Sequence, residues 1–197
     1  MDGLSIEMQG KLDALKEYIR NLGSLAVGFS GGVDSTFLLA VAHEVLGDRA
    51  IAVTTVDSAI PERELNEAKE FCIEHGIRHF ICAFDPLKIE GYRKNGPDRC
   101  YFCKHAVFTV IKKTADENGI EYLAEGSNMD DLGDYRPGLK AVEELAVKSP
   151  LRAADLYKAD IREISKAMGL PTWSKPAYAC LASRFVYGEE ITEQKAP

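Results

Sequence analysis

The sequence predicts an α/β fold: a mostly parallel five-stranded sheet with helices on both faces. Two observations lead to this prediction. Short apolar runs, typical of buried strands, alternate along the chain with longer segments of helical periodicity. Glycine follows most of the helical segments as a stop signal. Strands that alternate with helices form parallel sheets whose two faces are both covered.

The first half of the chain predicts a leading helix and two strand–helix units. Apolar side chains recur at helical spacing in the helices, and the second strand is rich in β-branched residues. A proline at the start of the third helix suits the first helical position. In order, the predicted elements are a helix over 6–22, a strand over 25–30, a helix over 35–47, a strand over 50–56 and a helix over 61–76.

The second half continues the alternation with shorter apolar runs. Its predicted elements are a strand over 79–84, a helix over about 103–118, a strand over 121–126, a fifth strand over 145–151 and a helix over 158–169. The last residues have no periodicity long enough to pack alone. We therefore expect one domain over 1–175, and over 176–197 the start of a C-terminal segment that is truncated or disordered.

Composition narrows the class of protein. The chain has 197 residues, a formal charge of −7 and 46% hydrophobic residues, which suits one domain with a real core. An acidic balance disfavours broad contact with nucleic acid, because phosphate binding needs clustered Lys and Arg. No run approaches the roughly 20 apolar residues of a membrane span. Five cysteines without a signal peptide predict reduced thiols and a cytoplasmic location.

The hexapeptide "SGGVDS", residues 30–35, lies between the first strand and its helix. Ligands of open parallel sheets bind beyond the carboxyl ends of strands. Gly31 and Gly32 let backbone amides approach an anion, and Ser30 and Ser35 can donate hydroxyl groups. Asp34 repels phosphate unless a cation such as Mg²⁺ lies between them. The loop therefore predicts a polyphosphate site, and it lacks the spacing of a Walker loop.

A Cys-x-x-Cys pair stands in "DRCYFCKHA", at Cys100 and Cys103. Such a pair can form a disulfide, a redox switch, half of a zinc site or part of an iron–sulfur ligand set. His105 can join a zinc site, so the spacing leaves these alternatives open. Cys72 and Cys82 are flanked by apolar residues and are expected in the core.

Three stretches carry a family resemblance. "SGGVDS" resembles the pyrophosphate loop of the PP-loop ATP pyrophosphatase superfamily, whose fold is adenine nucleotide α-hydrolase-like. "EGSNMDDLGDYRPGLKA" (125–141) and "SKPAYACLASRF" (174–185) resemble the LarE family, and the resemblance covers nearly the whole chain. It implies an ATP-dependent sulfur transferase of nickel-pincer nucleotide biosynthesis. The implied reaction adenylates a carboxylate of a pyridinium dicarboxylate mononucleotide and converts it to a thiocarboxylate.

The resemblance also implies how sulfur is handled. Cys180 matches a cysteine that some members sacrifice, whereas others use three cysteines to hold a [4Fe–4S] cluster. Cys100, Cys103 and Cys180 match the second pattern, which leaves one iron open for a sulfide. Sulfur donation by Cys180 itself, a zinc or disulfide site, a tRNA-thiolating enzyme and an iron–sulfur electron carrier stay open as alternatives. The family also implies inorganic sulfide or another sulfur donor as a partner, and a homo-oligomer.

Further residues are candidates for the site. Lys104 matches a lysine that the family places at the reaction centre, where it would balance charge on the ATP phosphates or the adenylated carboxylate. Asp34 and Cys180 are the other catalytic candidates. Asp130 and Asp131 suit either Mg²⁺ or a cap of the next turn. The other candidates for nucleotide or substrate binding are Asp57, Ser58, Gly126, Asn128, Arg136 and Arg184.

Overall fold

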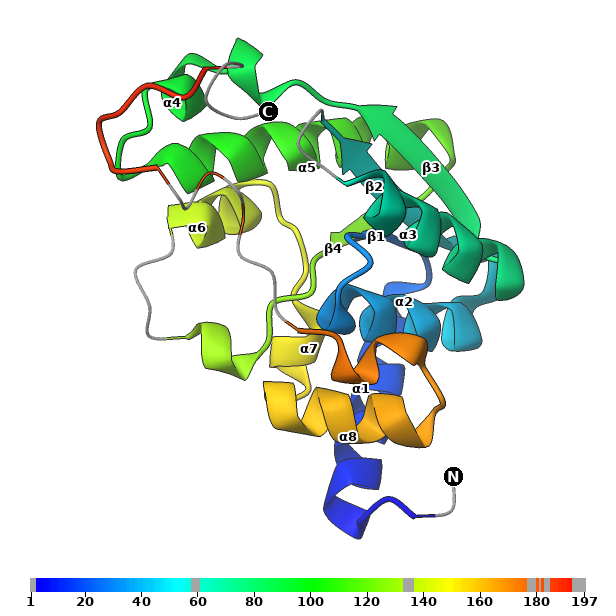
Figure 1. Ribbon diagram of the computed structural model, residues 1–197. Coiled ribbons are helices and arrows are strands. Elements are labelled where there is room, and N and C mark those ends of the chain that lie inside the picture. Colours follow the sequence, from blue (N-terminus) through cyan, green and yellow to red (C-terminus); the bar gives the residue numbers. More distant parts are fainter. Residues whose placement is uncertain are drawn as a thin grey trace.

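The protein is seen here in a computed structural model, which describes residues 3–57, 61–132, 137–176, 180, 182 and 185–192. Four parallel strands form the sheet in the order β3-β2-β1-β4. They are β1 (Leu25–Gly28), β2 (Ala50–Val56), β3 (Arg78–Ala83) and β4 (Tyr122–Ala124). The predicted α/β class with a parallel sheet is confirmed (Figure 1).

The predicted fifth strand over 145–151 is wrong for the described part of the chain. Only Lys148 bridges to the sheet, in parallel to Ala124. Its amide donates to the Leu123 carbonyl at 2.8 Å. Ala146 before it has a φ of +53°, and Pro150 after it begins a helix. A turn on one side and a helix start on the other leave too few extended residues for a strand.

Helices cover both faces of the sheet. Successive side chains of a strand point to opposite faces, so the apolar strands supply side chains to a core on each side. Leu25 and Val27 of β1 belong to the larger core cluster, and Ala26 between them belongs to the other. The larger cluster is covered by α1 (Ile6–Leu22), α2 (Val33–Leu46), α3 (Glu62–Glu74), α7 (Pro150–Ala153) and α8 (Lys158–Ala167). The opposite face carries α5 (Arg99–Glu117) and α6 (Pro137–Glu144).

The helix α5 begins four residues earlier than predicted. Cys100 and Cys103 therefore lie on its first turn, three residues apart, where side chains share one face of a helix. The short helix α4 (Glu90–Arg93) precedes it. The C-terminal segment begins at residue 176, and its residues 185–192 return to α4 and the start of α5 (Figure 1).

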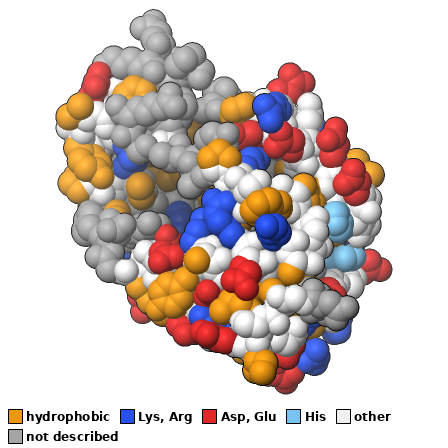
Figure 2. Space-filling view, turned by 60° about the horizontal axis from the view of Figure 1, so that its bottom comes forward, with side chains coloured by type: hydrophobic (Ala, Val, Ile, Leu, Met, Phe, Trp, Pro, Cys, Tyr) orange, Lys and Arg blue, Asp and Glu red, His pale blue; other side chains and the backbone are white. Residues whose placement is uncertain are grey.

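The remaining short elements are 3₁₀ turns: η1 (Gly47–Arg49), η2 (Pro86–Lys88), η3 (Met129–Asp131) and η4 (Pro171–Ser174). Acidic and basic side chains are interspersed on the face shown in Figure 2. Among the described helices, each is too short or too polar to cross a bilayer.

Candidate active site

The strand order creates a crevice at one edge of the sheet. From β1 the chain moves outward through β2 to β3, and it then returns to β4 on the other side of β1. The connections after β1 and β4 therefore leave the sheet in different directions, which is where open α/β sheets bind ligands. The loop over 30–35 follows β1, and the segment over 125–131 follows β4.

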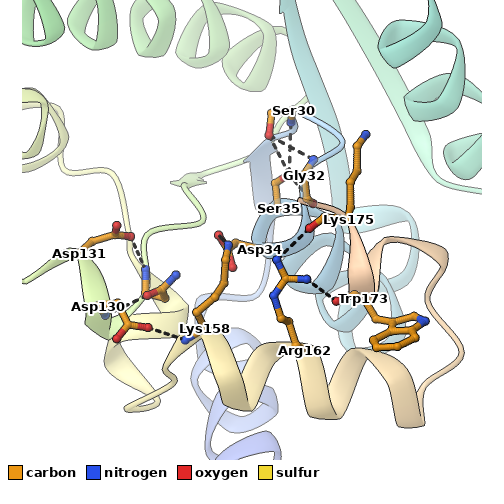
Figure 3. Close-up of polar contacts among 11 residues, drawn as sticks. Ser30, Gly32, Asp34, Ser35, Asp130, Asp131, Lys158, Arg162, Trp173 and Lys175 are labelled. Atoms are coloured by element: carbon orange, nitrogen blue, oxygen red, sulfur yellow. Dashed lines mark hydrogen bonds and ion pairs between the residues drawn. The ribbon is translucent and has the colours of Figure 1, made fainter. Parts of the chain in front are cut away.

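The loop after β1 is closed by its own two serines (Figure 3). The Ser30 amide donates to Ser35 Oγ at 3.3 Å, and the two hydroxyl oxygens lie 3.1 Å apart. Gly31 has a φ of +69°, which favours glycine, and Gly32 caps α2. The loop lies at the N-terminus of α2, where backbone amides and the helix dipole favour an anion.

Asp34, in the first turn of α2, is only half satisfied. Its Oδ2 pairs with Lys158 Nζ, at the start of α8 (Figure 3). Its Oδ1 is buried and has no hydrogen-bond donor within 3.5 Å among the described residues, although the Asn128 side chain is near enough to lower the pKa of Asp34. Burial raises the pKa of Asp34 above its usual value, although Lys158 acts in the opposite direction. A carboxylate with one open, buried oxygen is suited to a further cation.

The segment after β4 packs directly on this loop. A Cβ atom at Gly126 would lie 3.2 Å from the Ser35 amide and 3.3 Å from Asp34 Cβ, so a larger side chain would push the two segments apart. Gly126 thus lets them approach closely.

Asn128 and the two aspartates cap the turn η3. Asn128 Oδ1 accepts from the Asp130 amide and Asp131 Oδ2 accepts from the Asn128 amide, both at 2.9 Å. Asp130 Oδ2 also accepts from the Lys158 amide at 2.7 Å. Of the two roles considered for these aspartates, capping is the one that the contacts show.

Lys104 reaches back to the end of β4. Its Nζ pairs with Glu125 Oε2 at 2.8 Å, and Ser149 Oγ donates to Glu125 Oε1 at 3.0 Å. Glu125 is 6% exposed. A Cβ atom at Gly138 would lie 2.9 Å from Lys104 Cδ, so a larger residue at this position would collide with the lysine side chain. The ion pair joins the helix of the Cys-x-x-Cys pair to the strand that packs on the anion loop.

Replacing Lys104 by Met is expected to destabilise the fold at neutral pH by about 1–3 kcal/mol, because Glu125 would remain charged and buried without its cation. Burial raises the pKa of Glu125, but Lys104 and hydrogen bonds from Ser127 and Ser149 outweigh it and lower the pKa. The stability that this pair contributes is present above the unfolded-state pKa and lost as pH falls through the folded-state pKa.

The loss caused by Lys104→Met should therefore shrink in acid, where Glu125 is protonated in the variant. Denaturant unfolding at pH 7 and near pH 4 measures it. Lys112→Met is the matched control, since Lys112 pairs with Asp116 on the exposed side of α5 and such pairs contribute about 0–1 kcal/mol. A destabilisation that is equal at both pH values would contradict the charge-based explanation.

Three cysteines lie within electrostatic reach of one another. The pKa of the Cys103 thiol is raised to about 12, first by burial and then by the neighbouring Cys180, Cys100 and Asp57, in that order. Tyr92 of α4 has a pKa raised to about 12, through burial first and then through Cys180 and Cys103. Cys180, which is about eighty residues away in sequence, thus lies near the pair in space. These groups oppose one another's negative charge, and the Arg99 guanidinium partly offsets this by lowering the pKa of Cys103 and of Tyr92.

The described residues contain no group of three or more His, Cys, Asp or Glu side chains arranged to hold a metal ion. The five cysteines are free thiols; Cys72 is buried, Cys82 is partly buried, and Cys100 and Cys180 are exposed. The cysteines are therefore near one another without the geometry of bound metal.

Three predicted site residues, Ser58, Arg136 and Arg184, lie outside the described residues. Asp57 follows β2 directly, at the edge of the sheet that also carries the anion loop.

Two lysines at the anion loop escaped the sequence analysis. Lys158 pairs with Asp34, and Lys175 Nζ donates to the Gly31 carbonyl at 3.3 Å and pairs with Glu67 at 3.1 Å. Lys175 stands in the "SKPAYACLASRF" stretch, which was the available signal. Lys158 opens a helix and gave no local signal of its partner.

A cavity of about 710 Å³ lies beside Glu125. Ser149, the donor to Glu125, is one of its lining residues. Its walls are mostly apolar, with Leu132, Leu139 and Val142 among them, and Arg152 supplies a cation. Cavities of this size and lining take small-molecule ligands.

The parallel sheet and the loop at its switch point define the class, an open parallel α/β fold with its candidate site at the carboxyl ends of the strands. A sequence model of NAD synthase matches residues 7–94. The NH3-dependent NAD synthetase of Campylobacter jejuni, solved with nitrate, superposes with a TM-score of 0.67 at 16% identity, over 89% of this chain and 80% of that one. At that identity the likeness concerns the fold alone.

Two relatives found by sequence share a higher identity with this chain than the solved structure does. The uncharacterized protein slr1717 of Synechocystis is 40% identical over 188 residues, which cover 95% of this chain and 70% of that protein. The pyridinium-3,5-bisthiocarboxylic acid mononucleotide synthase of Lactiplantibacillus plantarum is 34% identical over 175 residues, which cover 88% of this chain and 63% of the synthase. The chain belongs to the family of slr1717.

Proposed function

We propose that this protein is an ATP-dependent sulfur transferase that activates a carboxylate as its adenylate and converts it to a thiocarboxylate. The observation that carries the proposal is the convergence of three cysteines beside the Lys104–Glu125 pair, which joins them to the anion loop. The likeness to the synthase of L. plantarum suggests a pyridinium dicarboxylate mononucleotide as substrate. The cavity beside Glu125 has room for a ligand of that size.

The anion loop would bind the phosphates of ATP. Backbone amides of Gly31 and Gly32, the hydroxyls of Ser30 and Ser35 and the N-terminus of α2 all favour negative charge there. Asp34, with its open oxygen, would hold Mg²⁺, which neutralises charge on the phosphates.

Two bond exchanges complete the reaction. A carboxylate oxygen of the substrate attacks the α-phosphorus of ATP, and the bond to pyrophosphate breaks. A sulfur nucleophile then attacks the acyl carbon, and AMP leaves with the bonding electrons. Lys104, partly exposed and next to Cys103, supplies positive charge where the adenylate forms.

The sulfur centre would be formed by Cys100, Cys103 and Cys180. On binding a [4Fe–4S] cluster these three cysteines would become its protein ligands, and the cluster would supply an open iron that can carry sulfide. Coordination would also offset the burial and the mutual repulsion that raise the pKa of Cys103, because a metal favours the thiolate form.

Anaerobic turnover tests the proposal. Reconstituted protein is given ATP, Mg²⁺, the pyridinium dicarboxylate mononucleotide and inorganic sulfide, and AMP and thiocarboxylate are measured by mass spectrometry. We expect several turnovers with the mass of Cys180 unchanged. Loss of one molecule of hydrogen sulfide from Cys180 after a single turnover would assign the sulfur to Cys180 itself. Absence of AMP, or thiolation of added tRNA instead, would contradict the proposed substrate.

A further inference from the structure

Two buried polar side chains have no part in the site as described so far. Asn95, between α4 and α5, is 0% exposed, and Arg99, the first residue of α5, is 5% exposed. Both donate hydrogen bonds to backbone carbonyls of the C-terminal segment, Asn95 to Val186 and Arg99 to Ala182. Buried polar groups are costly unless they are satisfied, so what they bind is informative.

Asn95 holds the segment by three hydrogen bonds. Its Nδ2 donates to the carbonyl oxygens of Val186 at 2.8 Å and Glu189 at 2.9 Å. Its own backbone carbonyl accepts from the Gly188 amide at 2.9 Å. Val186 and Glu189 are exposed, so the backbone is held while the side chains face solvent. The φ of Asn95 is +50°, a conformation that Asn adopts more readily than most residues.

Arg99 adds a buried cation. Its Nη1 donates to the Ala182 carbonyl at 2.7 Å and also to Asn95 Oδ1, and its guanidinium lies 5.7 Å from the ring centroid of Tyr187. These hydrogen bonds go to neutral oxygens. Since a buried guanidinium is expensive without partners, the carbonyl of the segment completes its solvation. Arg99, Asn95 and the segment therefore form one cooperative unit.

The unit connects the two parts of the thiol centre. Ala182 stands two residues after Cys180, whereas Arg99 immediately precedes Cys100 on α5. One guanidinium thus ties the backbone that bears Cys180 to the helical turn that bears the Cys-x-x-Cys pair. Further along, the Ile191 amide donates to the Arg93 carbonyl at 3.0 Å, and Ile191 is buried. The segment is fixed at several points rather than at one.

We propose that Asn95 and Arg99 are positioning residues, which hold Cys180 beside Cys100 and Cys103 by anchoring the C-terminal segment. The proposal rests on the proposed function only in that the three thiols act together, and the placement itself can be tested without ATP or sulfur transfer. An anchored thiol meets its neighbours far more often than one on a loose tether, because its effective concentration is higher.

Disulfide trapping measures this directly. Metal-free, reduced protein is treated with diamide, which takes two electrons and two protons from each pair of thiols. Peptide mapping by mass spectrometry then follows the linkage of Cys180 to Cys100 or Cys103. Arg99→Met, which removes the guanidinium, should slow this linkage at least about tenfold. Arg99→Lys keeps a cation that can donate, and it should stay within about threefold of the wild type.

Arg93→Met is the matched control. Arg93 pairs with Glu190 of the same segment at 3.1 Å, but both side chains are exposed, so linkage should stay within about twofold. A cooperative urea-unfolding transition, followed by circular dichroism, shows whether each variant folds. A merely structural role for Arg99 would lower the melting temperature and leave the linkage rate of the folded protein unchanged.

Gly188→Ala provides a second variant should Arg99→Met fail to fold. Gly188 has a φ of +88° at an exposed position, so alanine strains the segment without entering the core. We expect a smaller slowing, of about threefold. The proposal would be overturned if folded Arg99→Met or Gly188→Ala formed the linkage at the wild-type rate. It would also be overturned if Cys180 formed no linkage in the wild type. Normal trapping without AMP formation would overturn the proposed function alone.

Discussion

Asp34→Asn is expected to lower ATP-dependent release of pyrophosphate at least about 100-fold, while the chain still folds. An amide has almost the shape of a carboxylate but lacks the charge that holds Mg²⁺. Metal ions at phosphoryl centres contribute several kcal/mol of charge stabilisation, and each 1.4 kcal/mol is about a tenfold change in rate. The buried, open Oδ1 of Asp34 is the observation behind this expectation.

Pyrophosphate release with the carboxylate substrate measures the effect, and Mn²⁺ binding followed by electron paramagnetic resonance measures the metal. Asp116→Asn, on the exposed end of α5, is the matched control. Lys158→Met separates the two roles of Asp34, because it removes the ion pair and keeps the carboxylate. If Lys158→Met were as inactive as Asp34→Asn, the ion pair rather than the metal would be the function of Asp34.

Cys180→Ala is expected to abolish thiocarboxylate formation, with a loss of at least about 1000-fold, and to leave adenylation intact. The thiol centre and the anion loop are distinct parts of the site, so the adenylate still forms when the sulfur nucleophile is missing. Trapping of the adenylate with hydroxylamine measures the first step, and the thiocarboxylate measures the second. Cys100→Ala and Cys103→Ala should lose bound iron and sulfur transfer together.

Cys82→Ala is the control for removing a thiol elsewhere. Cys82 lies on β3, two strands away from β1 in the sheet, and it is partly buried, 3.4 Å from Thr114 Oγ1. Its replacement should leave both steps within about twofold. Sulfur transfer that persists in Cys100→Ala and Cys103→Ala but not in Cys180→Ala would show that Cys180 acts alone.

Local patterns were sufficient for most of the framework. The parallel sheet, the leading helix and the loop over 30–35 were predicted from the sequence, because apolar period, glycine stops and loop composition act over a few residues. The strand β2 has the predicted bounds, 50–56. The prediction of a fifth strand over 145–151 was wrong because the local apolar pattern was not decisive there. Its apolar run resembles a strand, but Ala146 and Pro150 impose a turn and a helix on either side.

The sequence by itself determined the class of fold, the anion loop and the identity of the three cysteines. Only the tertiary structure decided which distant charges meet: Lys158 with Asp34, and Lys104 with Glu125. Such contacts join residues 21 to 124 positions apart, and no short-range spacing encodes them. They arise because the strand order brings β1 and β4 together and because Asn95 and Arg99, buried, need carbonyl partners that the C-terminal segment supplies.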